Sequence, residues 1–290
     1  MTAQPITAEP TEQTQIDTES YTIRVSDHDA VVSILSKIFD HQRSHPDVYY
    51  YTRSRSYFRP DPDNSDHELW MLVTEYDNRE AYRKSLTDSL SGQHTTTEIA
   101  ALQELSVPAT TAESAVWTEF PELRVQFAFR EPLWPGCHNG ATTPADAITG
   151  APSEQTQFDQ GTFVINATDR EVFAGKLKTA LQHQNAHPEV FYYTRSRSFH
   201  RPHPQDPTKE LVSFFDEYDD RETYLKALMN VATSQEPAAA RVRELAGEFA
   251  KHVVFDDPLS SLEHKTWTEL KELRVQFPTR EPLWPCCTDS

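Results

Sequence analysis

The chain carries one sequence pattern twice, and this internal repeat constrains its fold more than any other feature. Residues 45–62 align without a gap on residues 187–204, a shift of 142 positions, and 13 of these 18 residues are identical. Residues 117–137 align on residues 267–287 at a shift of 150 positions, with 16 of 21 residues identical. Such a repeat indicates two copies of one folding unit.

Composition and charge limit the classes of partner. The 290 residues suit two domains of ordinary size, and a hydrophobic content of 37% supplies enough apolar surface for two cores. The formal net charge of -18 argues against a nucleic-acid binder or a protein of anionic membranes, because both depend on clustered Lys and Arg. We therefore expect a small-molecule substrate as the partner, with the oligomeric state left open and a homodimer among the alternatives.

The sequence contains no membrane or export signal of the usual kind. It has no run of 18 apolar residues, and its first twenty residues lack the basic and apolar regions of a signal peptide. We therefore expect a soluble, cytoplasmic protein. Cys137, Cys286 and Cys287 lie at the ends of the copies without metal-type spacing, which favours reduced thiols and no metal over a disulfide or zinc site.

Composition also predicts the domain boundaries. Residues 1–19 are rich in Thr, Gln, Glu and Pro and contain no Lys or Arg, so we expect a disordered tail. Residues 138–157 are rich in Gly, Ala, Thr, Pro and Ser, which is typical of a linker. The two folded units are then expected at residues 20–137 and 158–290.

Hydrophobic periodicity predicts the same elements in both copies. For the first copy these are a strand at 21–25, a helix from Ser26 to the His-Pro pair at 45–46, strands at 48–59 and 69–76, a helix opened by Asp77, a further helix, and a final strand at 123–127. In the second copy the corresponding helices are opened by Asp219 and begin at Pro237, and the final strand is at 273–277. This β-α-β-β-α-(α)-β order is the ferredoxin-like unit, an antiparallel sheet with helices on one face.

A sheet of this kind leaves its second face uncovered. Two units can cover these faces by packing sheet to sheet, so the tandem repeat predicts an α+β fold in which two ferredoxin-like units form a pseudo-dimeric α/β barrel.

Four sequence segments carry a family resemblance. They are HPDVYYYTRSRS and ELWMLVTEYDNREAYRKSL in the first copy and their repeats HPEVFYYTRSRS and ELVSFFDEYDDRETYLKAL in the second. The chain resembles the dimeric α/β-barrel superfamily and, within it, antibiotic-biosynthesis-monooxygenase-like domains. The resemblance covers about residues 21–90 and 163–228. It implies the fold more directly than the activity, because folds of this kind carry oxygenases, cyclases, isomerases and haem enzymes.

Alternation along the expected strands gathers tyrosines, arginines and glutamines on one face of each sheet. Burying unpaired guanidinium groups under a helix is costly, so we expect this face to line the barrel and bind a planar phenolic, quinoid or carboxylated ligand. The residues expected to bind substrate are Tyr51, Arg53, Arg55, Arg124, Gln126, Tyr193, Arg195, Arg197, Arg274 and Gln276. In the alternative interpretation, the arginines form structural ion pairs with Glu75, Glu119, Glu217 and Glu269.

Differences between the copies point to chemistry, because a duplicated barrel needs only one working site. Thr74 becomes Asp216 in an otherwise apolar strand, and Phe58 becomes His200. A carboxylate in such a strand can have a raised pKa and act as a general base, so Asp216 and His200 are the predicted catalytic residues. The alternatives are an Asp that reaches solvent or an arginine, and a solvated turn around His200 and His203.

These observations lead to one functional hypothesis and two alternatives. The hypothesis is a cofactor-independent enzyme, an oxygenase or a cyclase or isomerase, acting on an aromatic or polyketide-like substrate. No nucleotide or metal motif is present in the sequence, and haem, which some two-unit barrels of the superfamily bind, is the cofactor alternative. The non-enzymatic alternative is a ligand-binding or assembly protein.

Overall fold

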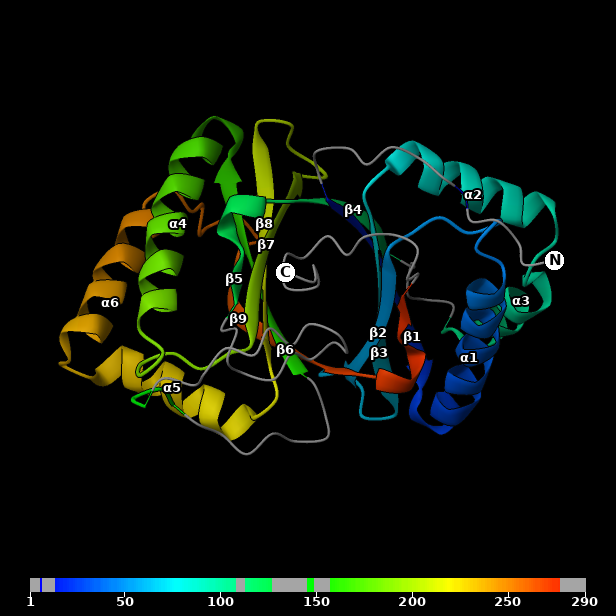
Figure 1. Ribbon diagram of the computed structural model, residues 1–290, viewed down its shortest axis with the longest axis horizontal. Helices are drawn as coiled ribbons and strands as arrows, with labels where there is room; N and C mark the ends of the chain where they lie inside the picture. The colour runs from blue at the N-terminus through cyan, green and yellow to red at the C-terminus, as the bar shows by residue number, and fades with distance from the viewer. Residues whose placement is uncertain (1–5, 7–13, 108–112, 127–144, 149–156, 277–290) are drawn as a thin grey trace. The chain divides into compact units, whose positions relative to one another are not determined.

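The computed structural model describes residues 6, 14–107, 113–126, 145–148 and 157–276, which form two compact units (Figure 1). Unit 1 contains the described residues of Met1–Thr118 and of Thr268–Thr288. Unit 2 contains the described residues of Glu119–Trp267. Each unit mixes helices with an antiparallel sheet, so the chain is of the α+β class.

Unit 1 is a sheet in the order β10-β2-β3-β1-β4, with helices on one face (Figure 1). Its elements in chain order are β1 (Gln15–Arg24), α1 (His28–Ser44), β2 (Arg53–Pro60), β3 (His67–Tyr76), α2 (Arg79–Ser91), α3 (Thr96–Leu105), β4 (Glu113–Glu119) and β10 (Val275–Gln276). The order β2-β3-β1-β4 is that of a ferredoxin-like sheet, in which the two central strands come from different halves of the unit.

Unit 2 repeats this arrangement in the order β5-β7-β8-β6-β9, again with its helices on one face (Figure 1). Its elements are β5 (Val125–Gln126), β6 (Gln157–Asn166), α4 (Arg170–Ala186), β7 (Arg195–Pro202), β8 (Lys209–Tyr218), α5 (Arg221–Thr233), α6 (Pro237–Ala250) and β9 (Ser261–Glu269). The predicted order of helices and strands is present in the described part of the chain, but the predicted final strands at 123–127 and 273–277 are wrong. The strand that completes the order is β4 in unit 1, where it pairs with β1, and β9 in unit 2, whereas the described residues of the predicted segments form a 3-10 turn and the short strands β5 and β10.

The compact units do not coincide with the sequence copies at 20–137 and 158–290. The short strand β5 belongs to the first copy in sequence but pairs with β7 of unit 2, and β10 belongs to the second copy but pairs with β2 of unit 1. The apolar residues around them follow the same exchange, since Leu123 lies in the core of unit 2 and Leu273 in the core of unit 1. Because residues 117–137 and 267–287 are nearly identical, either segment can supply the short strand of either sheet.

Three local predictions need correction. β1 begins at Gln15, so residues 15–19 form a strand rather than part of the tail, because a full antiparallel ladder with β3 satisfies their backbone groups. β2 begins at Arg53 rather than at residue 48, and the backbone N–H of Tyr50 donates to Ser85 instead of to a neighbouring strand. The helices after β3 and β8 are capped by Asn78 and Asp220, one residue later than predicted.

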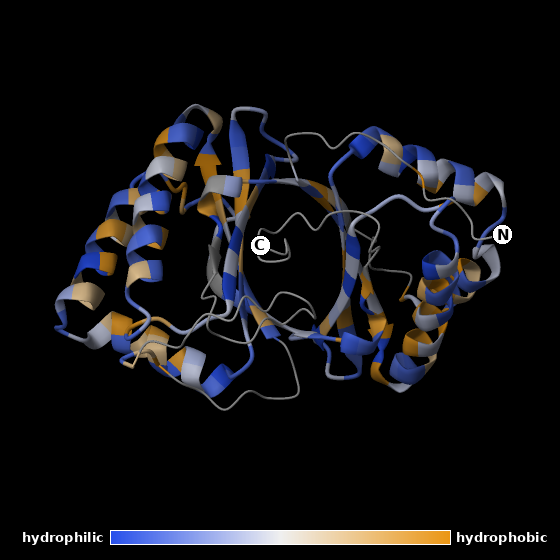
Figure 2. Cartoon of the chain, viewed as in Figure 1, coloured by the Kyte–Doolittle hydropathy of each residue, from blue (hydrophilic) through white to orange (hydrophobic). Residues whose placement is uncertain are grey.

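The apolar faces of the helices pack on the sheet of their own unit. In α1 the buried residues Val31, Leu35, Ile38 and Phe39 recur at helical spacing, as Phe173, Leu177 and Leu181 do in α4. Figure 2 shows apolar and polar positions mixed along every helix, as expected for helices with one buried and one exposed face. The sheet residues that point toward the helices are therefore enclosed on that side.

Some predictions fall on other residues. Most of the expected linker at 138–157 and all three cysteines lie outside the described residues. None of the helices that the structure describes has the length and apolar character needed to cross a lipid bilayer.

Candidate functional site

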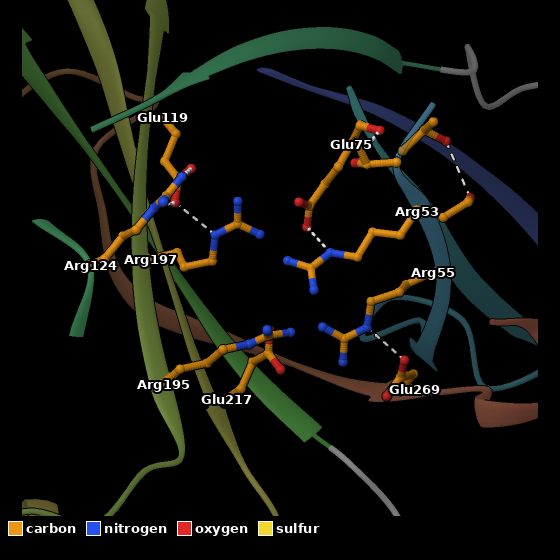
Figure 3. Close-up of polar contacts among 12 residues, drawn as sticks. Arg53, Arg55, Glu75, Glu119, Arg124, Arg195, Arg197, Glu217 and Glu269 are labelled. Carbon is orange, nitrogen blue, oxygen red and sulfur yellow. Dashed lines mark hydrogen bonds and ion pairs between the residues drawn. The ribbon is translucent and has the colours of Figure 1, made fainter. Parts of the chain in front are cut away.

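Unit 1 has a buried cluster of arginines and glutamates on the sheet face opposite its helices (Figure 3). The Nε atom of Arg53 lies 2.7 Å from Glu75, its cross-strand neighbour on β3. The Nε atom of Arg55 lies 2.6 Å from Glu269, and Nη2 of Arg274 lies 2.6 Å from the second oxygen of the same carboxylate. Glu269 thus joins two arginines that are distant in sequence.

Unit 2 contains the equivalent cluster (Figure 3). Arg195 pairs with Glu217 at 2.9 Å, and Arg197 pairs with Glu119 at 2.8 Å. Arg124 donates to the other oxygen of Glu119 at 2.5 Å. Three arginines and two glutamates give each cluster a formal charge of about +1 when all five groups are ionised.

The predicted ion pairs with Glu75, Glu119, Glu217 and Glu269 are therefore confirmed. Burial tends to raise the pKa of Glu119 and Glu269, but the neighbouring arginines outweigh this effect and hold both pKa values below the usual range. A substrate role for these arginines remains a prediction. The side chains of Gln126 and Gln276 lie outside the part of the chain that the structure describes.

The tyrosines predicted to share this face point elsewhere. The hydroxyl of Tyr51 donates to Gln42 of α1 at 2.5 Å, and that of Tyr193 donates to Gln184 of α4 at 2.9 Å. The strand alternation used in the prediction does not reach these residues, since β2 and β7 begin only at Arg53 and Arg195. Tyr51 and Tyr193 are therefore on the helix side of their units, away from the arginines.

The helix side of unit 2 contains a carboxylate bonded to two hydroxyls. Oδ1 of Asp159 on β6 accepts hydrogen bonds from Tyr218 at 2.7 Å and from Thr266 at 2.8 Å. The Tyr218 ring stacks on Tyr224 of α5, with ring centroids 4.2 Å apart. This contact places α5 directly over the carboxylates of the sheet.

Asp216 lies opposite Asp159 in the ladder between β6 and β8. Its other cross-strand neighbour is Ser196 of β7, and Oη of Tyr224 lies 3.4 Å from its Oδ2. Burial raises the pKa of Asp216, and the negative charge of Asp159 raises it further, while hydrogen bonds from Ser196 and Tyr224 act in the opposite direction. The predicted environment of Asp216, a carboxyl group with a raised pKa, is thus present.

Asp216 lines a pocket between the sheet and the helices of unit 2. The pocket has a volume of about 170 Å³. Its wall is mostly apolar or aromatic, with Asp216 as its carboxylate, Gln184 and the hydroxyls of the tyrosines as further polar groups, and Arg243 as its cation. The lining residues are Gln184, Phe191, Tyr192, Tyr193, Asp216, Tyr224, Ala227, Leu228, Val231, Val242, Arg243 and Ala246.

The corresponding positions of unit 1 are more polar and bonded to one another. Thr74 takes the place of Asp216, and its hydroxyl lies 3.2 Å from that of Ser54. Ser85 and Ser89, at the positions of Ala227 and Val231, are buried, and Ser89 donates to the hydroxyl of Tyr49 at 3.0 Å. The same framework therefore carries internal hydrogen bonds in unit 1 and an apolar wall around a carboxylate in unit 2.

The structure does not bring the second predicted catalytic residue to this pocket. The ring of His200 contacts Phe120, with ring centroids 4.4 Å apart and the ring planes tilted by 34°, and its Nδ1 lies 3.7 Å from Glu210. It is four residues beyond Ser196 on β7, about 13 Å along an extended strand. Asp216 and His200 thus belong to different environments.

His203 has a structural position. Its Nδ1 accepts hydrogen bonds from the backbone N–H groups of Gln205 and Asp206 at 3.1 and 3.0 Å, so it organises the turn between β7 and β8. Within the described ranges, no group of three or more His, Cys, Asp or Glu residues is arranged to hold a metal ion.

Two residues of this region were not identified from the sequence. Asp159 precedes the first predicted strand of its copy, and it becomes significant only through its register with Asp216. Tyr224 looks like an ordinary core residue of an amphipathic helix, and its contact with the carboxylate follows from the packing of α5. The sequence did offer one signal for Asp159: at a shift of 142 positions it aligns with Asp17, so both copies have an aspartate at this position.

Each unit is thus an α+β module of the ferredoxin-like type, with a helix-side pocket in unit 2. No protein-family model and no curated protein sequence matches the chain. Solved structures do match its fold, and the similarity extends over most of both chains. The chain has the fold of the dimeric α/β-barrel, ferredoxin-like superfamily.

Three such structures illustrate the similarity. A provisionally assigned monooxygenase from Lactobacillus acidophilus is 12% identical with a TM-score of 0.50, covering 91% of this chain and 97% of its own. One from Fusobacterium nucleatum is 8% identical with a TM-score of 0.51, covering 89% and 91%. An anthrone oxidase-like protein is 11% identical with a TM-score of 0.50, covering 89% and 90%. At these identities the likeness concerns the fold alone.

Proposed function

We propose that this chain is a small-molecule enzyme, that the pocket of unit 2 is its site, and that Asp216 is its general base. The observation that carries the proposal is the coincidence of three properties at one residue. Asp216 differs from its counterpart in the other copy, lines a pocket with mostly apolar walls, and has a raised pKa. Perturbed carboxyl groups in clefts are typical of acid–base catalysis.

The size of the pocket indicates a substrate with a single ring. A cavity of about 150 Å³ holds one benzene molecule, and the pocket here measures about 170 Å³. Pockets for larger ligands usually have volumes of about 300–1,000 Å³. The aromatic side chains of Phe191 and Tyr193 suit stacking on such a ring, so a monocyclic phenol or enolisable ring ketone fits better than an extended polyketide.

In the proposed reaction Asp216 removes a proton from the phenolic oxygen or from an acidic ring carbon. The hydroxyl of Tyr224, whose contact with Asp216 is long at 3.4 Å, then turns to donate a hydrogen bond to the resulting oxyanion. If dioxygen follows, a ring CH₂ group becomes C=O, one oxygen atom remains in the product and the other leaves as water, with all four electrons supplied by the substrate. If isomerisation or ring closure follows, the proton returns to another atom.

Haem, the cofactor alternative for this superfamily, does not fit the pocket. Haem iron takes His, Cys, Met or Tyr as an axial ligand, and the residues that line the described pocket offer only tyrosines, whose hydroxyls donate to Asp219, Gln184 and Asp216. A volume of about 170 Å³ is also smaller than the usual range for cofactor sites. No step of the proposed reaction therefore uses haem.

Resorcinol provides a test, because reversible deprotonation of this single-ring phenol exchanges its ring hydrogens for deuterium in D₂O. We expect the protein to accelerate this exchange above the buffer rate, and proton NMR measures the loss of the ring signals. Replacing Asp216 by Thr, the residue of the first copy, should reduce the enhancement about 100-fold or more.

The control is His200→Phe, which likewise introduces the residue of the first copy but lies outside the pocket. Its exchange rate should remain within about twofold of the wild type, since surface and remote changes rarely alter a site. Resorcinol that binds in the pocket and exchanges at equal rates in the wild type and the Asp216→Thr variant would contradict the proposed role of Asp216.

A further inference from the structure

The two carboxylates Asp159 and Asp216 face each other across the sheet of unit 2. They are direct partners in the antiparallel register of β6 and β8, and the Cβ atoms of such partners lie about 5 Å apart. In unit 1 the equivalent partners are Asp17 and Thr74, so the pairing of two acids is specific to unit 2 at these positions. Like charges at this distance oppose simultaneous ionisation.

The two acids differ in their hydrogen bonds. Oδ1 of Asp159 already accepts two hydroxyl hydrogens, from Tyr218 and Thr266, and Asp159 is buried. Asp216 accepts hydrogen bonds from Ser196 and, at a long 3.4 Å, from the Tyr224 hydroxyl, and it borders the pocket. A proton placed on Asp216 leaves both short bonds to Asp159 intact.

We propose that Asp159 and Asp216 hold one proton between them in the free protein, that this proton resides on Asp216, and that Asp159 is the positioning residue that keeps it there. The inference rests on the proposed function of the pocket and adds to it a second residue. Asp159 does not line the pocket, so it acts on the substrate only through Asp216.

The remaining charged and titratable groups around Asp216 do not replace Asp159. Arg243 of α6 lines the pocket, but its guanidinium group donates to the backbone oxygens of Val231 and Ser234 at the end of α5. His264 of β9 is substantially exposed and lies 3.8 Å from the carboxylate of Asp159. Among the described residues, the titratable groups that line the pocket or act on Asp216 are Asp159, Tyr192, Tyr193, Tyr224, Arg243 and His264.

The shared proton has a chemical consequence. A general base works best when it changes protonation state near the operating pH. Burial is the largest effect that raises the pKa of Asp216, and the negative charge of Asp159 acts in the same direction, against the opposing effects of Ser196, His264 and Tyr224. In the molecules whose Asp216 has lost the shared proton, the carboxylate can then accept a substrate proton and return it, which suits reversible proton transfer to a ring.

Carboxyl ¹³C NMR of the full chain, with Asp labelled at Cγ, tests this inference without a substrate. In the wild type the Asp216 resonance should titrate mainly in the upper of two steps and show a smaller inflection in the lower one, because interacting acids share macroscopic steps. In Asp159→Asn the Asp216 midpoint should fall by about one pH unit or more. The Asn Oδ1 atom can still accept the hydrogen bonds from Tyr218 and Thr266.

Asp17→Asn is the matched control, because Asp17 has the same place opposite Thr74 in unit 1 and should leave the Asp216 titration unchanged. An Asp216 resonance with one midpoint and no second inflection in the wild type, or an Asp216 midpoint that does not move in Asp159→Asn, would overturn the shared proton. Neither result depends on resorcinol exchange. If the Asp216 titration shows no coupling but the protein still accelerates resorcinol exchange, only the role of Asp159 is rejected. If the titration is coupled but the protein does not accelerate the exchange, only the proposed function is rejected.

Discussion

Replacing Glu269 by Gln is expected to lower the free energy of unfolding by about 3–5 kcal/mol, the usual cost of breaking a buried ion pair from one side. Glu269 is 4% exposed and receives Arg55 and Arg274 on its two oxygens. Gln preserves its shape but removes the negative charge between the two guanidinium groups. Urea denaturation, followed by fluorescence and circular dichroism, measures the loss.

The pH dependence of this difference has a definite sign. The pKa of Glu269 in the folded chain lies below its usual value of 4.5. Its stabilisation is therefore fully present above the unfolded-state pKa and is lost as the pH falls through the folded-state pKa. The stability gap between wild type and Glu269→Gln should be constant near neutral pH and narrow below 4.5.

Glu244→Gln is the control, because Glu244 and its partner Arg241 are exposed and such pairs contribute about 0–1 kcal/mol. A loss below about 1 kcal/mol in Glu269→Gln would show that the buried cluster contributes no more than a surface pair. The structural interpretation of the arginines would then lose its energetic basis, and a ligand-binding role would become the better explanation.

Asp216→Thr is expected to abolish the proposed proton transfer while increasing stability. At neutral pH, ionising Asp216 in the folded chain costs free energy, because its raised pKa means that folding favours the protonated form. Its contribution therefore falls as the pH rises from the unfolded-state pKa toward the folded-state pKa. Thr can bond to Ser196 as Thr74 does to Ser54, and we expect a gain of about 0.5–2 kcal/mol at neutral pH.

The reciprocal variant Thr74→Asp provides the matched comparison. It places a carboxylate opposite Asp17 in unit 1, where Ser85 and Ser89 are buried and hydrogen-bonded. We expect it to destabilise the chain without creating resorcinol exchange. Asp216→Thr with reduced stability and unchanged exchange would identify Asp216 as a structural residue and contradict its catalytic assignment.

The sequence predicts the repeated element order well, because helix and strand periods repeat in both copies and leave few alternatives. The arginine–glutamate ion pairs are the alternative interpretation of the sequence, and the difference between the copies singles out Asp216. The sequence does not predict the exchange of β5 and β10 between units, because residues 117–137 and 267–287 are nearly identical and either can complete either sheet.

The helix-side location of the pocket was also not predicted. The orientation of Tyr51 and Tyr193 depends on the residue at which β2 and β7 begin. The alternation of side chains in the sequence does not indicate that these strands start only at Arg53 and Arg195. The role of Asp159 depends on strand register, which pairs residues 57 positions apart. Such contacts are set by tertiary packing rather than by local pattern.

The location of resorcinol binding tests the central claim most directly, namely that the working pocket is on the helix side of unit 2. A ¹⁵N and methyl ¹³C NMR titration of the full chain follows every region at once. The account predicts saturable shifts at Tyr193, Ala227 and Val242, with Tyr51 and Ser85 of unit 1 unchanged. Saturable shifts at Arg53, Arg55, Arg195 and Arg197, with the unit 2 pocket unchanged, would contradict it.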